Sequence, residues 1–133
     1  MARRFILLAL LFATPATGRD TIGIYGGWGA FRELAPLHCF AIAEPVTGSG
    51  RSGWRPFLAI GDRGTRLVSD ATGADGWAAS PRIDAAIVAA IRGGTSLSVQ
   101  SRDRNGRLFA DGYRLRGAAS AIDAAALGCA RRG

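Results

Sequence analysis

The sequence predicts an α+β protein: a mostly antiparallel β-sheet, or a small β-sandwich, with two short helices packed on it. Short apolar stretches alternate with turns rich in Gly, Pro, Ser and Asp, which is typical of β-strands. One central segment and one Ala-rich segment near the carboxyl end have the apolar periodicity of helices. The connections are short, which favours antiparallel neighbours.

The first half of the chain predicts strands separated by turns. A segment that mixes β-forming residues with Gly predicts one strand near Trp28 to Arg32. The later strands are dense in apolar residues, and the residues between them are those that favour turns. The later predicted strands are 37–44, 55–62 and 66–70, with a loop over 45–53 and a brief segment after Trp77.

The central helix has the clearest signals at both ends. Ser80 is expected at the N-cap and Pro81 at the first helical position, and Gly93 lies just past the predicted end. Isoleucine recurs at every fourth position inside this segment. Because this spacing forms one apolar stripe, we expect the helix to lie on the sheet. The stripe consists of Ile83, Ile87 and Ile91.

The last third predicts a hairpin followed by a helix. Residues 95–101 alternate apolar and polar side chains, an Asn-Gly pair at 105–106 predicts a tight turn, and 106–117 is the return strand. Ser120 is expected to cap the final helix, with Asp123 as the acid of a capping box. Four residues are expected on the inward face of this helix: Ile122, Ala125, Ala126 and Cys129.

The amino-terminal residues predict a secretory signal peptide. Two arginines precede an apolar run over residues 5–13, and Ala16 and Gly18 suit a cleavage site. The run is shorter than the roughly 20 apolar residues that span a bilayer. We therefore expect residues 1–18 to be a signal peptide and residues 19–133 to be a single exported domain, periplasmic or secreted, without a membrane segment.

The two cysteines, Cys39 and Cys129, are an even number in a chain predicted to be exported, which favours a disulfide. Two buried free thiols remain the alternative. A catalytic pair of Cys39 with His38 is disfavoured, because neighbours on a strand point to opposite faces. One histidine and two cysteines also fall short of the ligand set of a typical zinc site, so we expect no metal site.

The chain is basic, and all of its basic residues are arginines. Removing two leader arginines from the 17 basic residues leaves 15 against 10 acidic ones, a net charge of +5. Arginine binds carboxylate and phosphate well, although GC-rich coding produces the same bias and stays open as an explanation. Five arginines at or near the predicted hairpin form the candidate anion-binding surface: Arg102, Arg104, Arg107, Arg114 and Arg116.

No constellation of catalytic residues is recognised. The acidic residues are scattered over strand ends and turns, and His38 is expected to pack beside Phe40. We therefore expect no catalytic residues and no cofactor. Three tryptophans remain open between sugar stacking and core packing, with core packing as the default. They are Trp28, Trp54 and Trp77.

These observations together predict a non-enzymatic exported protein that binds an unidentified component of the cell envelope. The expected partner is an anionic glycan, a lipid headgroup or a protein, and not nucleic acid, because the chain is predicted to leave the cytoplasm. Two alternatives are an inhibitor of an acidic envelope enzyme and a small hydrolase that uses Asp residues in a cleft.

Several stretches resemble the invasion-associated locus B family of exported bacterial proteins. The stretches are WGAFRE with HCFAIAEP, RPFLAIGDRG, DAAIVAAIRGGTSLSV and DGYRLRGAASAIDA. The resemblance implies a small secreted or periplasmic β-rich domain without catalytic residues. The family pattern has more cysteines: Arg32 stands near the place of the first, and the mid-chain pair is absent. The resemblance therefore implies that Cys39 has lost a local partner and that a long-range bridge to Cys129 replaces it.

Overall fold

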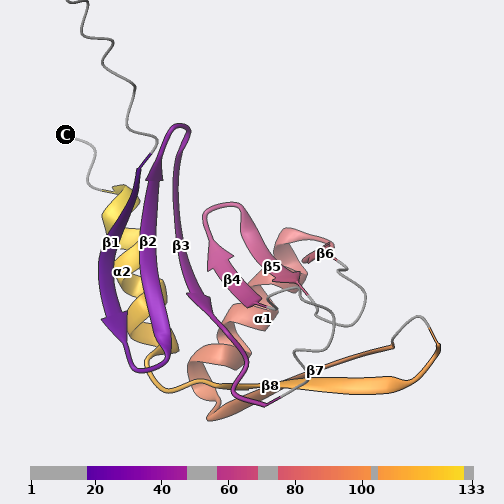
Figure 1. The fold of residues 1–133 in the computed structure, drawn as a ribbon. Coiled ribbons are helices and arrows are strands. Elements are labelled where there is room, and N and C mark those ends of the chain that lie inside the picture. The colour runs from indigo at the N-terminus through magenta and orange to yellow at the C-terminus, as the bar shows by residue number, and fades with distance from the viewer. Residues whose placement is uncertain (1–17, 48–56, 69–74, 103–104, 131–133) are drawn as a thin grey trace, which may run out of the picture.

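A computed structural model describes residues 18–47, 57–68, 75–102 and 105–130. These residues form a mostly antiparallel β structure with two helices packed on it, which confirms the predicted α+β class. The strands form a six-stranded sheet and a separate two-stranded hairpin. Figure 1 shows the helices behind the large sheet. Apart from Gly18, the predicted signal peptide lies outside the described residues.

The large sheet is a meander in which each strand pairs with the next along the chain. All five pairings are antiparallel, as short turns between consecutive strands require. The strand order therefore equals the sequence order. The strands are β1 (Arg19–Tyr25), β2 (Trp28–Leu34), β3 (Leu37–Ala43), β4 (Phe57–Gly61), β5 (Gly64–Val68) and β6 (Asp75–Trp77).

The amino-terminal segment forms a hairpin, so the expectation of a single strand near Trp28 was wrong. Gly26 has φ 59°, a conformation that glycine adopts easily, and it reverses the chain between β1 and β2. The pairing of β1 shifts between Thr21 and Gly23, which is a β-bulge. Because a bulge interrupts the alternation of inward and outward residues, β1 carries no clear period of two in the sequence.

Helix α1 (Pro81–Gly93) confirms the predicted start at Ser80 and Pro81, but it runs one residue further than predicted, with Gly94 at its C-cap. The hydroxyl of Ser80 accepts a hydrogen bond from the backbone N–H of Ile83 at 3.2 Å, and the helix ends at Gly93. The predicted apolar stripe holds at Ile91, which is buried, but Ile83 is 47% exposed. In the first turn of α1, a polar contact and not Ile83 joins the helix to the sheet. The carboxylate of Asp84 faces β5 and accepts a hydrogen bond from the backbone N–H of Thr65 at 2.7 Å.

The second sheet is the predicted hairpin of β7 (Ser96–Arg102) and β8 (Leu108–Arg114). Gly106, with φ 77°, lies in its turn. The return strand is shorter than the predicted 106–117. The hairpin is joined to the chain after β3 by backbone hydrogen bonds between Val46, Thr47 and Gly112.

Helix α2 (Ala118–Ala130) begins before the expected cap. Ser120 lies inside the helix, and Asp123 forms an ion pair with Arg92 of α1, so the predicted capping box was wrong. The turn before α2 holds Gly117 at φ 88°, where any Cβ would lie 1.9 Å from the carbonyl oxygen of Tyr25. Only glycine fits this contact, which brings the turn before α2 against the end of β1.

The core lies between the large sheet and the two helices. Helix α2 packs on β1, β2, β3 and β4, and α1 packs on β5 and on α2. The inward face of α2 matches the prediction at Ile122, Ala125 and Cys129, whereas Ala126 is exposed. The strand residues of the core alternate with outward ones, as one face of a pleated sheet requires. These strand residues are Trp28, Ala30, Cys39, Ala41, Ala43, Leu58 and Ile60.

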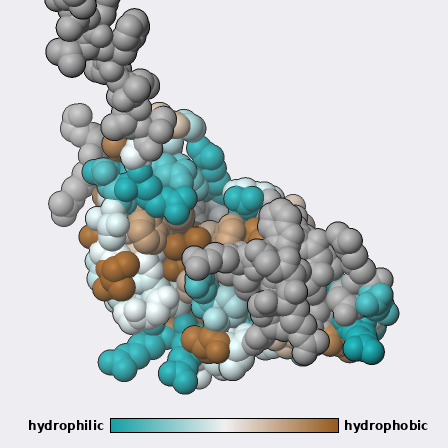
Figure 2. Space-filling view, viewed as in Figure 1, coloured by the Kyte–Doolittle hydropathy of each residue, from teal (hydrophilic) through white to brown (hydrophobic). Residues whose placement is uncertain are grey.

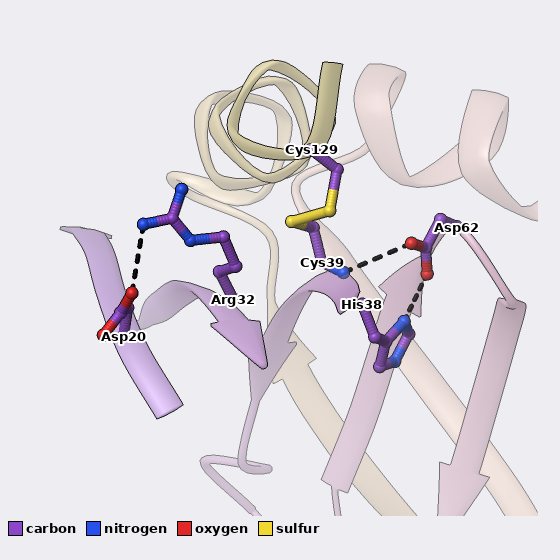
Figure 3. Close-up of a disulfide and its surroundings, with 6 residues drawn as sticks. All are labelled: Asp20, Arg32, His38, Cys39, Asp62 and Cys129. Atoms are coloured by element: carbon purple, nitrogen blue, oxygen red, sulfur yellow. Dashed lines mark hydrogen bonds and ion pairs between the residues drawn. A yellow bond between two sulfur atoms is a disulfide. The ribbon is translucent and has the colours of Figure 1, made fainter. Parts of the chain in front are cut away.

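The predicted disulfide is present and joins β3 to α2. Cys39 and Cys129 are bonded, with their Cα atoms 5.9 Å apart and 90 positions between them in the sequence. Figure 3 shows Cys39 directed toward α2, while its neighbour His38 points to the other side of the sheet. Arg32 is paired directly opposite Cys39 on β2. Because the disulfide joins a strand to a helix, it links the sheet to the helical layer and not two strands of the sheet. No helix among the described residues is long and apolar enough to cross a bilayer.

Candidate functional site

The face of the large sheet opposite the helices is the candidate site. Each strand alternates, so the residues between the core positions point to this second face. No described helix covers it, and Figure 2 shows apolar side chains on this side of the molecule, below a band of hydrophilic residues. Ile24 of β1 is 66% exposed and Trp77 of β6 is 51% exposed. We call this surface the open face.

The open face is hollowed into a groove with a volume of about 700 Å³. It is partly open to solvent and crosses the large sheet from β1 to β6. Its lining combines aromatic rings with arginines, a pairing that binds ligands carrying both apolar surface and negative charge. The aromatic and ionisable lining residues are Arg19, Phe31, Glu33, His38, Phe40, Glu44, Phe57, Arg63, Arg66, Trp28 and Trp77.

One wall of the groove is built around Arg19. Its guanidinium carbon lies 5.8 Å from the ring centre of Phe31 and 5.2 Å from that of Phe40, which are paired directly across β2 and β3. These distances are within the range of cation–π contacts. Arg19 also donates two hydrogen bonds to Glu33, at 3.2 and 2.7 Å. The wall therefore consists of two rings under one positively charged plane.

The other wall repeats this arrangement around Arg66. Its guanidinium carbon lies 5.5 Å from the ring centres of both Phe57 and Trp77. Trp77 is paired directly opposite Arg66 across β5 and β6. The two walls thus come from opposite halves of the sheet, and each places a guanidinium over two aromatic rings.

The floor between the walls is made mainly of small residues. Phe40 of β3 is paired with Gly61 of β4, and Gly61 with Gly64 of β5. In the next row, Ala59 pairs with Arg66. Gly61 is fixed as glycine, because a Cβ there would lie 2.4 Å from the carbonyl oxygen of Cys39. Small side chains between two aromatic walls explain why this face is a trough and not a flat sheet surface.

His38 lines the groove beside the Arg19 wall. Its ring stacks on Phe40 with the centroids 5.0 Å apart, which confirms the expected packing. Its Nδ1 contacts Oδ1 of Asp62, and Oδ2 of Asp62 accepts a hydrogen bond from the backbone N–H of Cys39 at 3.3 Å (Figure 3). The carboxylate orients the imidazole, whose Nε2 is left as the polar atom for a ligand.

The sequence did not predict the partnership of His38 with Asp62. Asp62 follows β4, and Asp at a strand end is usually explained by local turn bonds. The contact depends on the register between β3 and β4, which no local pattern specifies. The aromatic rings of the open face had a signal that could have been used: strands 37–44 and 55–62 are apolar on both faces, which predicts exposed apolar residues if only one face is covered.

The predicted anion-binding arginines are spread over the two ends of the hairpin. Arg102 lies at the end of β7 beside the tip, where it donates a hydrogen bond to the carbonyl of Gly106, and Arg107 is exposed next to it. Arg114 ends β8 at the other end, and Arg116 lies in the turn before α2 and not on the strand. The structure therefore does not bring the two groups together. Arg104 lies outside the described residues.

The tryptophans behave differently from one another. Trp28 is fully buried, and its indole N–H donates a hydrogen bond to the carbonyl of Arg114 at 2.9 Å, so it is mainly a core residue. Trp77 is half exposed in the groove, and Trp54 is outside the described residues. Within the described ranges, no group of three or more His, Cys, Asp or Glu side chains is placed to hold a metal ion.

No family model, curated protein or solved structure matches this chain. The site is therefore interpreted from its own geometry.

Proposed function

We propose that this protein is an exported, non-enzymatic binding module of the cell envelope, and that it binds its partner in the groove of the open face. Membership of the invasion-associated locus B family, from the resemblance of its sequence stretches, is part of this proposal. A small, disulfide-linked, β-rich domain is compatible with that family.

Export is supported by two independent features. The amino-terminal residues have the layout of a signal peptide. The Cys39–Cys129 disulfide belongs to the class of bonds that form and persist mainly in oxidising compartments. Intact mass measurement of the protein from culture tests the proposal: the expected species lacks residues 1–18 and gains two daltons on reduction.

The observation that carries the binding role is the open face itself. Large aromatic and aliphatic side chains on a groove that no described helix covers are typical of interaction sites, because soluble proteins rarely leave such surface exposed without a function. Two guanidiniums held over aromatic rings add polar groups that orient a ligand.

The test replaces exposed apolar residues inside and outside the groove. Ile24→Ser and Trp77→Ala change the groove, whereas Ile83→Ser and Leu127→Ser change equally exposed positions on α1 and α2. Retention on separated polysaccharide, lipid and protein fractions of the envelope is measured for each. We expect the groove variants to lose about tenfold in retention on one fraction and the helix variants to keep it. Equal retention of all four variants would place binding elsewhere and reject this site.

A further inference from the structure

Resting on the proposed function, we propose that the groove binds an acidic polysaccharide, with its carboxylates held by Arg19 and Arg66 and its sugar rings on the floor between them. This assigns a chemical class of ligand to the site. The argument uses the charge of the lining, the geometry of the two guanidiniums and the shape of the floor.

The charge of the groove favours an anion. Three arginines line it, and two glutamates oppose them. Arg63 is exposed at the turn between β4 and β5 and adds to the charge of the Arg66 wall. The predicted mature chain, with its net charge of +5, reinforces the attraction over a longer range.

The two guanidiniums have a form suited to carboxylates. A guanidinium carries five N–H donors in one plane, and this fork matches the two oxygens of a carboxylate. Glu33 uses the Nε and Nη2 groups of Arg19, so further donors of Arg19 remain for a ligand. The Arg19–Glu33 pair is also exposed on both sides, and exposed pairs contribute little, so an incoming carboxylate can compete with it.

The spacing of the walls points to an anion that repeats along a chain. The Arg19 guanidinium lies over rings from β2 and β3, and that of Arg66 lies by rings from β4 and β6. With strands about 4.8 Å apart, the two charges are separated by roughly 12 Å. One carboxylate cannot reach both, whereas a polymer with a charge on its sugar units can.

The floor fits sugar rings better than an acyl chain. Ala59 and Gly61 leave room for a flat ring on the sheet. The arginines and glutamates of the lining suit the polar groups of a sugar chain better than a lipid tail, which mostly apolar cavities hold. His38 stands at the side of the floor, where its imidazole can bond a hydroxyl group.

Calorimetric titration with an oligogalacturonate, and with the same oligosaccharide fully methyl-esterified, tests the proposal. The esterified probe keeps the sugar chain but has no charge, so we expect it to bind at least tenfold more weakly. Arg66→Lys keeps a charge but loses the planar stack, and about fivefold weaker binding is expected. Ala59→Leu fills the floor without changing charge and is expected to weaken binding about tenfold.

Glu33→Gln is expected to strengthen binding, which misfolding of the variant would not do. It removes the carboxylate that occupies part of Arg19, so we expect about threefold tighter binding of the charged probe at low salt. Arg82→Ala on α1 and Arg102→Ala at the hairpin tip are matched controls outside the groove and are expected to bind like the wild type.

Several outcomes would overturn the acidic glycan. They are equal affinity for both probes, loss of binding in Arg102→Ala but not in Arg66→Lys, and groove-dependent binding of phosphatidylglycerol vesicles with no binding of the oligosaccharide. If the charged probe fails while Ile24→Ser and Trp77→Ala still lose their envelope fraction, the binding module stands and only the ligand class is rejected.

Discussion

His38 and Cys39 are adjacent in sequence and act on opposite sides of the sheet. Cys39 faces α2 and forms the disulfide, whereas His38 faces the groove and stacks on Phe40. The period of two along a strand was enough to predict this division from the sequence. The partner of His38 was not predictable, because Asp62 is brought to it by strand pairing and not by spacing.

Tyr113 of β8 is a buried ionisable residue whose titration is coupled to folding. Its side chain is 1% exposed, and burial raises its pKa above the usual range, with the carboxylates of Asp111 and Glu44 acting in the same direction. The folded state therefore favours the neutral phenol more than the unfolded state does. The stability from this difference is complete below about pH 10, the ordinary tyrosine value, and is lost as the pH rises further.

We predict that Tyr113→Phe flattens this alkaline loss of stability. The hydroxyl of Tyr113 has no hydrogen-bond partner among the described residues, so its removal at pH 7 is expected to change the free energy of unfolding by less than about 1 kcal/mol. The chain has no lysine, which simplifies the alkaline titration. Urea unfolding between pH 7 and 11 measures both effects. If the unfolding free energies of the two proteins fall in parallel as the pH rises, the prediction is contradicted.

At the scale of elements, α1 is tied to β5 by one carboxylate. Oδ1 of Asp84 accepts hydrogen bonds from both the backbone N–H and the hydroxyl of Thr65, at 2.7 and 2.6 Å, and Thr65 is buried. A buried backbone N–H that loses its acceptor costs the desolvation of that group. Asp84 therefore holds the first turn of α1 where the isoleucine stripe does not.

We predict that Asp84→Ala lowers the free energy of unfolding by about 2 kcal/mol. Asp84→Asn is expected to lose less than half of this, because the amide oxygen still accepts a hydrogen bond. Asp123→Ala is the control, since its pair with Arg92 joins α1 to α2 on the exposed surface. Chemical denaturation compares the three, and amide exchange of Thr65 reports the lost contact directly. A loss in Asp84→Asn equal to that in Asp84→Ala would show that the hydrogen bonds are not the cause.

Most elements were predictable because their signals are local. The caps of α1 at Ser80 and Pro81, the hairpin turn at Gly106 and strand β3 depend only on neighbouring residues. The wrong capping box came from a contact distant in sequence. Asp123 matches a capping box but pairs with Arg92 of the other helix, whose guanidinium lowers the pKa of Asp123 through their hydrogen bond.

For the whole molecule, the disulfide is the strongest single constraint on the unfolded chain. It links the third strand to the last helix over 90 positions, which spans most of the described fold. In the chain-entropy model, closing a loop of this length stabilises by about 4–5 kcal/mol. This is a large share of the roughly 5–15 kcal/mol by which a domain is usually stable.

We predict that the double variant Cys39→Ala with Cys129→Ala loses about 4–5 kcal/mol of unfolding free energy. Alanine is chosen because Cys39 is buried, and a serine hydroxyl there would add its own cost. Thermal and urea unfolding of the oxidised, reduced and double-variant proteins give the measurement. A loss under about 1 kcal/mol would mean that packing of α2 on the sheet, and not the covalent link, holds the two layers.

The open face depends on the architecture of the whole molecule, which is why the sequence did not reveal it. Local patterns show that β3 and β4 are apolar on both sides but not which side the helices cover. The sequence therefore predicts its candidate arginines at the hairpin, whereas Arg19 and Arg66 reach the same groove only through the pairing of strands β1 to β6.

Because side chains alternate along each strand of the large sheet, one set of positions packs in the core and the other set lines the groove. Ala41 and Ile60 belong to the packed layer, while Ala59 and Phe40 belong to the groove, although each lies next to the other set in the chain. Exposed groove positions, such as Ile24 and Trp77, can therefore be exchanged with little effect on the layer beneath. This makes the sheet a scaffold whose selectivity can be retuned, by selection or by directed evolution, while its architecture is retained.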